Sequence, residues 1–322
     1  MAAIRRIRLS GYHSALDTND DLCMTRNLAR QCFAAVMASY LSLLYPSLSI
    51  ANNETPNSSD TATVLAWCDD LGRRLRSVSA EKCRKQAFRL ANERTSGGRA
   101  LVWRDIQAKQ TPTNTATAPR VLVIGGIHGD ELSSVSIVFR WLEWIDEADA
   151  GHYHWRVIPA SNPDGLLKRP STRANGRGVD LNRNFATPDW ASDAQNYWIK
   201  RTKRDPRRYP GESPASEIET RWLQDQLNDF QPDVIISLHA PYNLLDYDGP
   251  APQPLRFGRL ALNRLGVYPG SLGNYGGHFK QIPVVTIELP SAGIMPTLRE
   301  QRLMWDDMLT WMGKHIQSTR KP

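Results

Sequence analysis

The chain has 322 residues, of which 41% are hydrophobic and 23% are charged. This ordinary globular composition allows one sizeable core, or a core with a small appendage, and excludes a low-complexity chain. The formal net charge of +7 suggests anionic partners, but the basic residues are dispersed and we find no nucleic-acid motif. The densest basic run, residues 200–208, lacks interleaved aromatic residues, so we expect a solvated loop rather than a patch for an acidic polymer.

The N-terminal region has the layout of a secretory signal peptide that begins at Met24. Arg26 and Arg30 precede an apolar run at residues 32–44, and residues 49–51 place small side chains at the −3 and −1 positions of a cleavage site. We therefore expect Met24 to be the true start, a mature N-terminus near residue 52, and a periplasmic or secreted protein without a stable membrane span. The alternative is a buried N-terminal helix, which would fit a cytoplasmic protein.

The four cysteines are Cys23, Cys32, Cys68 and Cys83. Signal processing would remove the first two and leave an even pair. An oxidising compartment would then allow Cys68 and Cys83 to form a disulfide across an amphipathic segment, with two free thiols as the alternative.

The remaining chain divides by composition at residue 99. Residues 52–63 are a polar linker and residues 64–88 a small helical element, so we describe residues 52–98 as a linker and small helical segment. Residues 64–98 would act as a packing cap on the catalytic domain or, alternatively, as an inhibitory or lid element. Within residues 99–318, short apolar strands alternate with amphipathic helices. The pattern predicts an α/β fold with a mixed, mainly parallel sheet, helices on both faces, and catalytic groups at strand ends. The expected strands are 100–106, 121–126, 155–159, 233–239 and 283–289, and the expected helices are 131–147, 216–230, 255–265 and 297–316.

A candidate metal site follows the strand at residues 121–124. Gly125 and Gly126 end this strand, and His128 and Glu131 then lead into a helix, so an imidazole and a carboxylate can converge on one point. Zinc accepts both ligand types, and a catalytic zinc site has three protein ligands. His-x-x-Glu alone is a weak pattern, because polar residues at a helix start are common.

Further polar residues occur at comparable places in the chain. His239 follows the apolar strand at residues 233–238, just as His128 follows an earlier apolar strand. Glu288 lies inside another apolar strand, where burying a carboxylate without a partner costs free energy and therefore indicates a functional role. Arg183, flanked by Asn182 and Asn184 in a turn-rich run, is equipped to bind a carboxylate with its forked guanidinium group.

Together these motifs resemble the zinc carboxypeptidases of the M14 (carboxypeptidase A) family over residues 99–315. The matching segments are His128-x-x-Glu131, NPDG at 162–165, Arg173-x-Asn175, GVDLNRNF at 178–185, PASEIET at 214–220, SLHAP at 237–241 and TIELP at 286–290. The resemblance implies that His128, Glu131 and His239 bind one zinc ion per chain. It also implies that Glu288 is the general base and acid, and that Arg173 stabilises the oxyanion.

The resemblance further implies residues that bind and orient. Asn182 and Arg183 would hold the terminal carboxylate of the substrate, and Asp180 would orient His128. The tyrosine of the family's mobile loop has no unambiguous counterpart, and Tyr275 is our candidate for this substrate-binding role, with Tyr268 as the alternative.

Residues 239–250 and 268–277 resemble the murein peptide amidase branch of the family. This resemblance implies cleavage of the γ-D-glutamyl–meso-diaminopimelate bond of cell-wall peptides. The aspartoacylase and succinylglutamate desuccinylase group, which deacylates N-acyl amino acids, shares the His-x-x-Glu and DLNR segments and is the nearest alternative. A zinc-dependent binding protein without catalysis is a third.

Overall fold

The computed structural model describes residues 58–322, except 110–116, 146–149, 251, 319 and 321–322. The predicted signal peptide, the Met24 start, Cys23 and Cys32 therefore lie outside the described residues. Within the described part of the chain, no helix is both long enough and apolar enough to cross a membrane.

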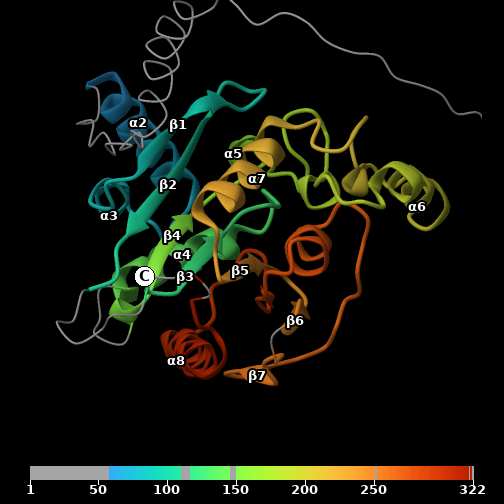
Figure 1. Cartoon of the computed structure of the whole chain (residues 1–322). Helices are drawn as coiled ribbons and strands as arrows, with labels where there is room; N and C mark the ends of the chain where they lie inside the picture. Colours follow the sequence, from blue (N-terminus) through green and yellow to red (C-terminus); the bar gives the residue numbers. More distant parts are fainter. Residues whose placement is uncertain (1–57, 110–116, 146–149, 251, 319, 321–322) are drawn as a thin grey trace, which may run out of the picture. The chain divides into compact units, whose positions relative to one another are not determined.

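A seven-stranded sheet with the order β1-β2-β4-β3-β5-β9-β6 organises the described chain (Figure 1). The central neighbours β4, β3, β5 and β9 pair in parallel, whereas β1, β2 and β6 form antiparallel pairs. This confirms the predicted mixed, mainly parallel sheet. The strands are β1 (Arg89–Arg94), β2 (Ala100–Ile106), β3 (Arg120–Ile124), β4 (His154–Ile158), β5 (Val234–His239), β6 (Leu244–Asp248) and β9 (Val284–Glu288).

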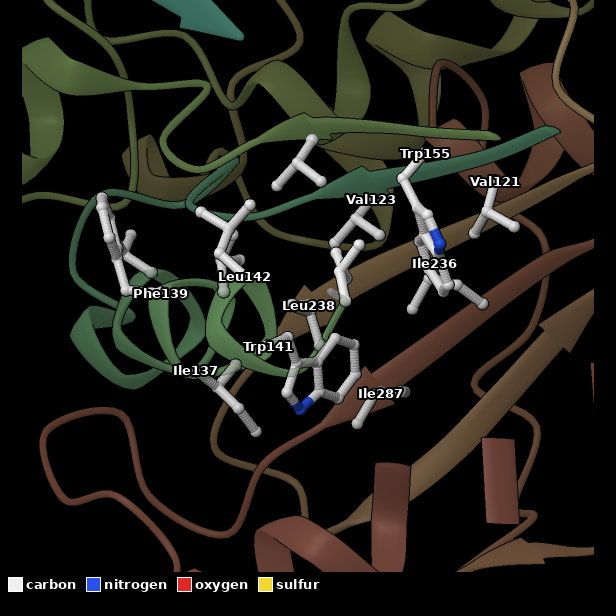
Figure 2. Packing of buried hydrophobic residues seen from close by; sticks show 14 of the residues in the cluster. Val121, Val123, Ile137, Phe139, Trp141, Leu142, Trp155, Ile236, Leu238 and Ile287 are labelled. Atoms are coloured by element: carbon white, nitrogen blue, oxygen red, sulfur yellow. The ribbon is translucent and has the colours of Figure 1, made fainter. Parts of the chain in front are cut away.

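Alternating side chains of the strands build a core on each face of the sheet. Val121 and Val123 of β3 belong to a cluster with α4 (Leu132–Ile145) and α8 (Leu298–His315), whereas Leu122 and Ile124 belong to a cluster with α7 (Ile218–Phe230). This alternation follows from the two-residue period of a strand. Figure 2 shows the first cluster, in which side chains of α4 lie beside those of the central strands. Helices therefore cover both faces, as the apolar character of the strands predicts.

Residues 58–94 form part of this fold. The helix α2 (Ser58–Arg74) and the short α3 (Ala80–Arg84) are joined by a disulfide between Cys68 and Cys83, which confirms the predicted pairing. The segment continues into β1, which pairs with β2. Phe88 makes edge-to-face contacts with Trp67 of α2 and Phe139 of α4. The segment is thus packed onto the sheet and α4, as a cap would be.

Two expectations in the N-terminal part differ from the structure. The predicted linker at 52–63 already contains the start of α2 at Ser58, because serine, threonine and aspartate also suit the first turn of a helix, where Asp60 lies. The predicted helix at 64–88 is interrupted after Arg74, and α3 begins beyond Ser79, whose side chain accepts a hydrogen bond from the Lys82 amide.

The predicted helix at 255–265 is wrong. This stretch forms two short strands, β7 (Arg256–Phe257) and β8 (Leu260–Ala261), paired with each other. Gly258 between them has φ +55°, a left-handed conformation that interrupts a helix. Strand β6 was also missed. The remaining predicted helices correspond to α4, α7 and α8, and α8 begins with a capping box between Thr297 and Glu300. Two further short helices are α5 (Pro163–Leu167) and α6 (Gln195–Lys200).

Candidate metal centre and active site

The turn after β3 fixes His128 and Glu131. Gly126 has φ +61°, and a Cβ atom on Gly129 would overlap the backbone of Gly165 in the NPDG turn. The turn therefore packs directly against NPDG, and only glycine allows this approach. Ser134, in the first turn of α4, donates a hydrogen bond to the Glu131 carbonyl, so the base of the Glu131 side chain is held at the helix start.

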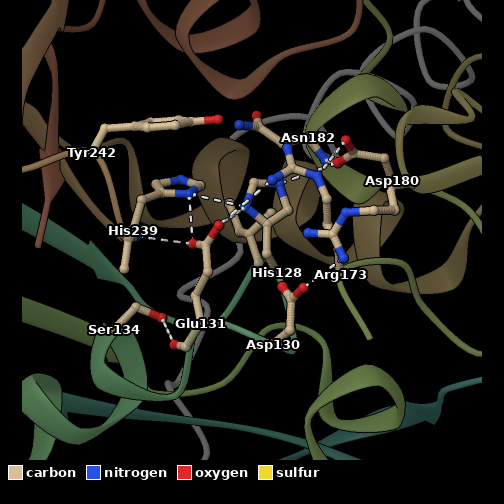
Figure 3. A network of polar contacts seen from close by, with 12 residues as sticks. His128, Asp130, Glu131, Ser134, Arg173, Asp180, Asn182, His239 and Tyr242 are labelled. Carbon is tan, nitrogen blue, oxygen red and sulfur yellow. Dashed lines mark hydrogen bonds and ion pairs between the residues drawn. The ribbon is translucent and has the colours of Figure 1, made fainter. Parts of the chain in front are cut away.

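His128, Glu131 and His239, which we call the triad, converge on one point (Figure 3). The Nδ1 atom of His128 lies 2.8 Å from Oε1 of Glu131, and Nδ1 of His239 lies 3.2 Å from Oε2 of the same carboxylate. All three side chains are at least 95% buried. Residues 111 positions apart in the sequence are thus brought together by the parallel pairing of β3 with β5.

The donor set fits a metal cation. The two Nδ1 atoms lie 3.1 Å apart, and two N–H groups cannot point at each other at this distance, whereas two lone pairs can share a cation. The opposite nitrogen of each ring has its own partner: Nε2 of His128 lies 3.2 Å from Asp180 Oδ1, and Nε2 of His239 lies 3.0 Å from Ser237 Oγ. Such outer partners orient metal-binding histidines. Asp180 therefore lies where the family resemblance places it.

Charges around the triad favour an ionised carboxylate. Burial alone would raise the pKa of Glu131, but the neighbouring His128 and His239 outweigh it and hold this pKa well below its usual range. Burial and Arg173 would lower the pKa of His128, but Glu131 and Asp180 raise it on balance. An anionic Glu131 is the form that binds a cation.

Glu288 faces the triad from the neighbouring strand. The register of β5 and β9 pairs it with His239, and its Oε2 atom accepts a hydrogen bond of 3.4 Å from the Tyr242 amide. The side chain is 4% exposed and lines the same cavity as His128 and His239. Burial raises the pKa of Glu288, and the charge of Glu131 contributes in the same direction. The Glu288 carboxylate, which is unexpected in an apolar strand, therefore lies at the end of β9 beside the predicted metal-binding residues.

Arg173 reaches the triad from the loop that follows α5. Its Nε atom donates a hydrogen bond of 3.0 Å to Asp180 Oδ2, and its Nη1 atom lies 3.5 Å from Glu131 Oε1. Asn162 of the NPDG turn donates a hydrogen bond to the Arg173 carbonyl and thereby holds the backbone. A fixed cation next to the metal ligands is well placed to stabilise developing negative charge.

Arg183 is a buried cation with a free donor. It is 6% exposed, its guanidinium group stacks on the Tyr268 ring at 4.4 Å, and its Nη1 atom donates to the Asn182 carbonyl. Its Nε atom has no hydrogen-bond partner among the described residues. The Asn182 side chain accepts a hydrogen bond from the Leu272 amide. Arg183 and Asn182 both line the cavity, so a carboxylate there would supply the missing acceptor.

The cavity has a volume of about 160 Å³, and six of the predicted site residues line it: His128, Arg173, Asn182, Arg183, His239 and Glu288. Glu131 and Asp180 contact His128 but do not line the cavity. Tyr275 is not among its lining residues. It lies 4% exposed in the hydrophobic cluster on the α7 face of the sheet, with its ring 5.6 Å from that of Phe185. Tyr268 and Tyr242 are the tyrosines that line the cavity. The substrate-binding tyrosine is therefore better assigned to one of these two.

Three charged lining residues escaped the sequence analysis as site residues. Asp246 and Asp248 alternate with buried Leu245 and Tyr247 along β6, and this period of two would have indicated a strand with both acids on one face. Arg208 belongs to the basic run that we expected to be a solvated loop, and it lines the cavity.

A second buried acidic group supports the loop that carries Arg173. Asn175 donates a hydrogen bond of 2.8 Å to Glu217 Oε2 and lies 3.3 Å from Glu219 Oε2, while its own oxygen accepts from the Arg177 and Val179 amides. Burial raises the pKa of Glu219 to about 7, and the nearby charges of Asp164 and Glu217 contribute.

Comparisons with known proteins agree with this site. The model of the zinc carboxypeptidase family (peptidase M14) matches residues 84–249. Murein peptide amidase A of Escherichia coli is 32% identical over 170 residues, which is 51% of this chain and 65% of that protein. The protein of the same name from Vibrio campbellii is 30% identical over 188 residues, or 56% of this chain and 73% of that one.

Among solved structures, bovine thrombin-activatable fibrinolysis inhibitor has a TM-score of 0.55 and 17% identity, over 79% of this chain and 97% of that chain. This likeness shows a carboxypeptidase A-like fold. The family match covers both histidines and the glutamate of the triad. The chain therefore belongs to the zinc carboxypeptidase family.

Proposed function

We propose that this chain is a zinc-dependent amidase that releases the C-terminal residue of murein peptides by cutting the γ-D-glutamyl–meso-diaminopimelate bond. The observation that carries the proposal is Arg183, a buried cation that lines the same cavity as His128, His239 and Glu288. Its Nε donor has no hydrogen-bond partner among the described residues. A residue released from a C-terminus has a carboxylate next to the amide bond that is cut. The identity of 30–32% with two murein peptide amidases supports the wall peptide as substrate.

The residues of the cavity divide the reaction between them. Zinc held by His128, Glu131 and His239 would supply a Lewis acid that polarises the scissile carbonyl and lowers the pKa of water. Glu288 takes a proton from the attacking water and delivers it to the departing amine as the C–N bond breaks. Arg173 faces the negative charge that develops on the carbonyl oxygen, an interaction of roughly 3 kcal/mol in comparable sites.

Export from the cytoplasm is part of the proposal. The signal-like residues 24–51 and the disulfide between Cys68 and Cys83 both fit an oxidising compartment. Mass spectrometry of the protein recovered from the periplasm or medium tests this, and we expect a mature N-terminus near residue 52. An intact Met1 on the recovered protein would contradict it.

The substrate is tested by mass spectrometry of L-Ala-γ-D-Glu-meso-diaminopimelate incubated with the mature chain. We expect release of free diaminopimelate that a zinc chelator abolishes and added zinc restores. Release from N-acyl amino acids with none from peptides would instead identify a deacylase. Intact peptide that stays bound after long incubation would identify a binding protein.

A further inference from the structure

A second cavity is lined by the last turn of α2, by residue 99 and by the end of α5 with the loop that follows it. It has a volume of about 160 Å³ and shares no lining residue with the cavity that contains His128 and His239. Three stretches of the chain that are far apart in the sequence contribute its walls. The lining residues are Asp70, Arg73, Arg74, Arg99, Leu167 and Arg169. Four arginines and one aspartate thus surround a single hollow.

The acidic groups near this cavity leave part of its positive charge uncompensated. Asp70 is shared by two arginines, because it forms an ion pair with Arg73 and lies 3.7 Å from Nη1 of Arg99. The Nε atom of Arg99 also lies 3.5 Å from Asp164, a buried carboxylate that already accepts hydrogen bonds from residues 95–97. Arginines that converge on so few acids repel one another, which costs free energy unless an anion joins them.

The other two arginines have no carboxylate partner among the described residues. The Nε atom of Arg74 donates hydrogen bonds of 2.9 Å to the Leu166 carbonyl and 3.1 Å to the Ser171 hydroxyl, which are both neutral acceptors. These bonds fix the Arg74 guanidinium group without neutralising it. Arg169 is exposed and forms neither a hydrogen bond nor an ion pair within the described part of the chain. One guanidinium group is therefore held in position, and another is free to bind a ligand.

The end of helix α2 explains only part of this cluster. Arg73 and Arg74 lie in the last turn of α2, where positive side chains offset the helix dipole. Arg99 directly precedes β2, and Arg169 follows α5, so neither belongs to that helix end. The convergence of all four guanidinium groups on one cavity therefore has a cause other than the stability of α2.

The donor set indicates the chemical class of the ligand. A guanidinium group presents a planar fork of N–H donors that matches the oxygens of carboxylate and phosphate groups. A carboxylate carries one charge on two oxygens, whereas a phosphate group carries up to two charges and has at least three acceptor oxygens. Four arginines around one aspartate therefore favour phosphate over a single carboxylate.

We propose that Arg73, Arg74, Arg99 and Arg169 form a binding site for a phosphate group, separate from the active site. The phosphate is either free in solution or part of a lipid headgroup, and both sources present the same oxygens to the guanidinium groups. The proposal goes beyond the proposed function and does not depend on it, because none of these arginines lines the cavity of the metal-binding histidines.

The first test is calorimetric titration of the purified full chain with inorganic phosphate at constant ionic strength, which holds the screening of surface charges fixed. Arg169→Gln is the main variant. Because Arg169 makes no hydrogen bond or ion pair with the described residues, we expect this variant to fold. Its phosphate affinity should fall by about 10-fold or more, and Arg169→Lys, which keeps the charge but not the fork, should lie between it and the wild type.

Two controls locate the bound phosphate. Arg299→Gln removes an exposed arginine of α8 that does not line the cavity, and it should leave the affinity unchanged. Arg183→Gln tests whether phosphate binds in the active-site cavity instead. No binding to the wild type, an equal affinity in Arg169→Gln, an equal loss in Arg299→Gln, or a loss confined to Arg183→Gln would each overturn the proposal.

A stability measurement provides a second readout. Phosphate bound at this site would contact both α2 and the loop after α5, so it should raise the melting temperature of the wild type and of Arg299→Gln. The increase should be much smaller in Arg169→Gln. The same increase in all three proteins would contradict binding at this site.

Vesicles of phosphatidylglycerol distinguish the two sources of the phosphate group. Sedimentation of the wild type with the vesicles, weakened in Arg169→Gln and reversed by inorganic phosphate at constant ionic strength, would identify a lipid headgroup as the ligand. Binding of inorganic phosphate without sedimentation would identify free phosphate. Both results support the site, whereas sedimentation of the wild type without any binding of inorganic phosphate would overturn it.

Discussion

Buried carboxylates serve different purposes in this chain, and their partners distinguish them. Glu131 lies between two histidines and is held anionic. Glu288 accepts one hydrogen bond, from the Tyr242 amide, within the described part of the chain, and this leaves it free for the proposed proton transfer. Glu219 does not line the cavity, and burial raises its pKa to about 7. Each of these roles leads to a different measurable consequence.

Glu288→Gln should abolish turnover while the metal stays bound. The amide cannot accept the water's proton, but the three metal-binding side chains are untouched. We expect kcat to fall by a factor of about 100 or more, with zinc content near one per chain by elemental analysis. Wild-type turnover in this variant would remove Glu288 from the mechanism.

Glu219→Gln should remove a pH dependence of stability. The pKa of Glu219 is about 7 in the folded chain and near its usual 4.5 in the unfolded chain, so folding binds the proton more tightly. Its contribution is fully present below pH 4.5 and is lost as the pH rises through 7, by an amount on the order of 3 kcal/mol. Urea unfolding at pH 5 and pH 8 measures it.

The variant Glu219→Gln should therefore be more stable than the wild type at pH 8 and similar at pH 4.5. Glu212→Gln provides a matched control, because Glu212 is largely exposed. If both variants follow the pH profile of the wild type, Glu219 does not titrate as described.

The site residues that could be predicted from the sequence were those with a local signal. His128 and His239 each follow an apolar strand, and Glu288 stands out within one, so chain order alone pointed to a shared strand edge. Asp246 has only a weak signal, the alternation of acidic and apolar residues along β6, and the low strand propensity of aspartate obscures it. Tyr275 was misplaced because a tyrosine in a glycine-rich stretch looks exposed, whereas packing against Phe185 buries it.

At the scale of elements, the central strands were predictable and the edges were not. Strands β3 and β5 are almost wholly apolar, and β4 and β9 each contain a run of two or more apolar residues, so all four produce a hydrophobic signal. The edge strands β1 and β6 carry charged residues, which obscure the pattern. Residues 255–265 contain apolar residues at mixed spacing, and the left-handed Gly258 lies at the turn between β7 and β8.

The disulfide should stabilise the N-terminal segment measurably. Cys68 and Cys83 close a loop of 15 residues, for which chain entropy predicts about 3 kcal/mol. We expect the double substitution Cys68→Ala and Cys83→Ala to lower the free energy of unfolding by about 3 kcal/mol, as measured by a denaturant titration. Reduction of the wild type should produce the same change, and a loss below about 1 kcal/mol in both would contradict the prediction.

For the whole molecule, metal binding should be coupled to folding. The triad joins the turn after β3 to the end of β5, so a cation bound there stabilises the folded chain alone. At a free zinc concentration 1,000 times the dissociation constant, binding raises the free energy of unfolding by about 4 kcal/mol. A chelator should therefore lower the melting temperature of the wild type, as followed by circular dichroism.

The control for this experiment is His239→Ala, which removes one ligand. Its melting temperature should respond little to zinc or chelator. A chelator effect of equal size in this variant would place the responsible metal elsewhere in the molecule.

The register of β9 and β6 has a consequence for how this enzyme can evolve. The pair Glu288–Leu244 and the pair Thr286–Asp246 are adjacent rungs of one ladder, held by the same backbone hydrogen bonds. Glu288 lies on one rung, and Asp246, which lines the same cavity, lies on the next. A substitution at position 246 would change the cavity wall, and we expect Glu288 to keep its place on the ladder, so the lining of the site can vary without loss of the proposed general base.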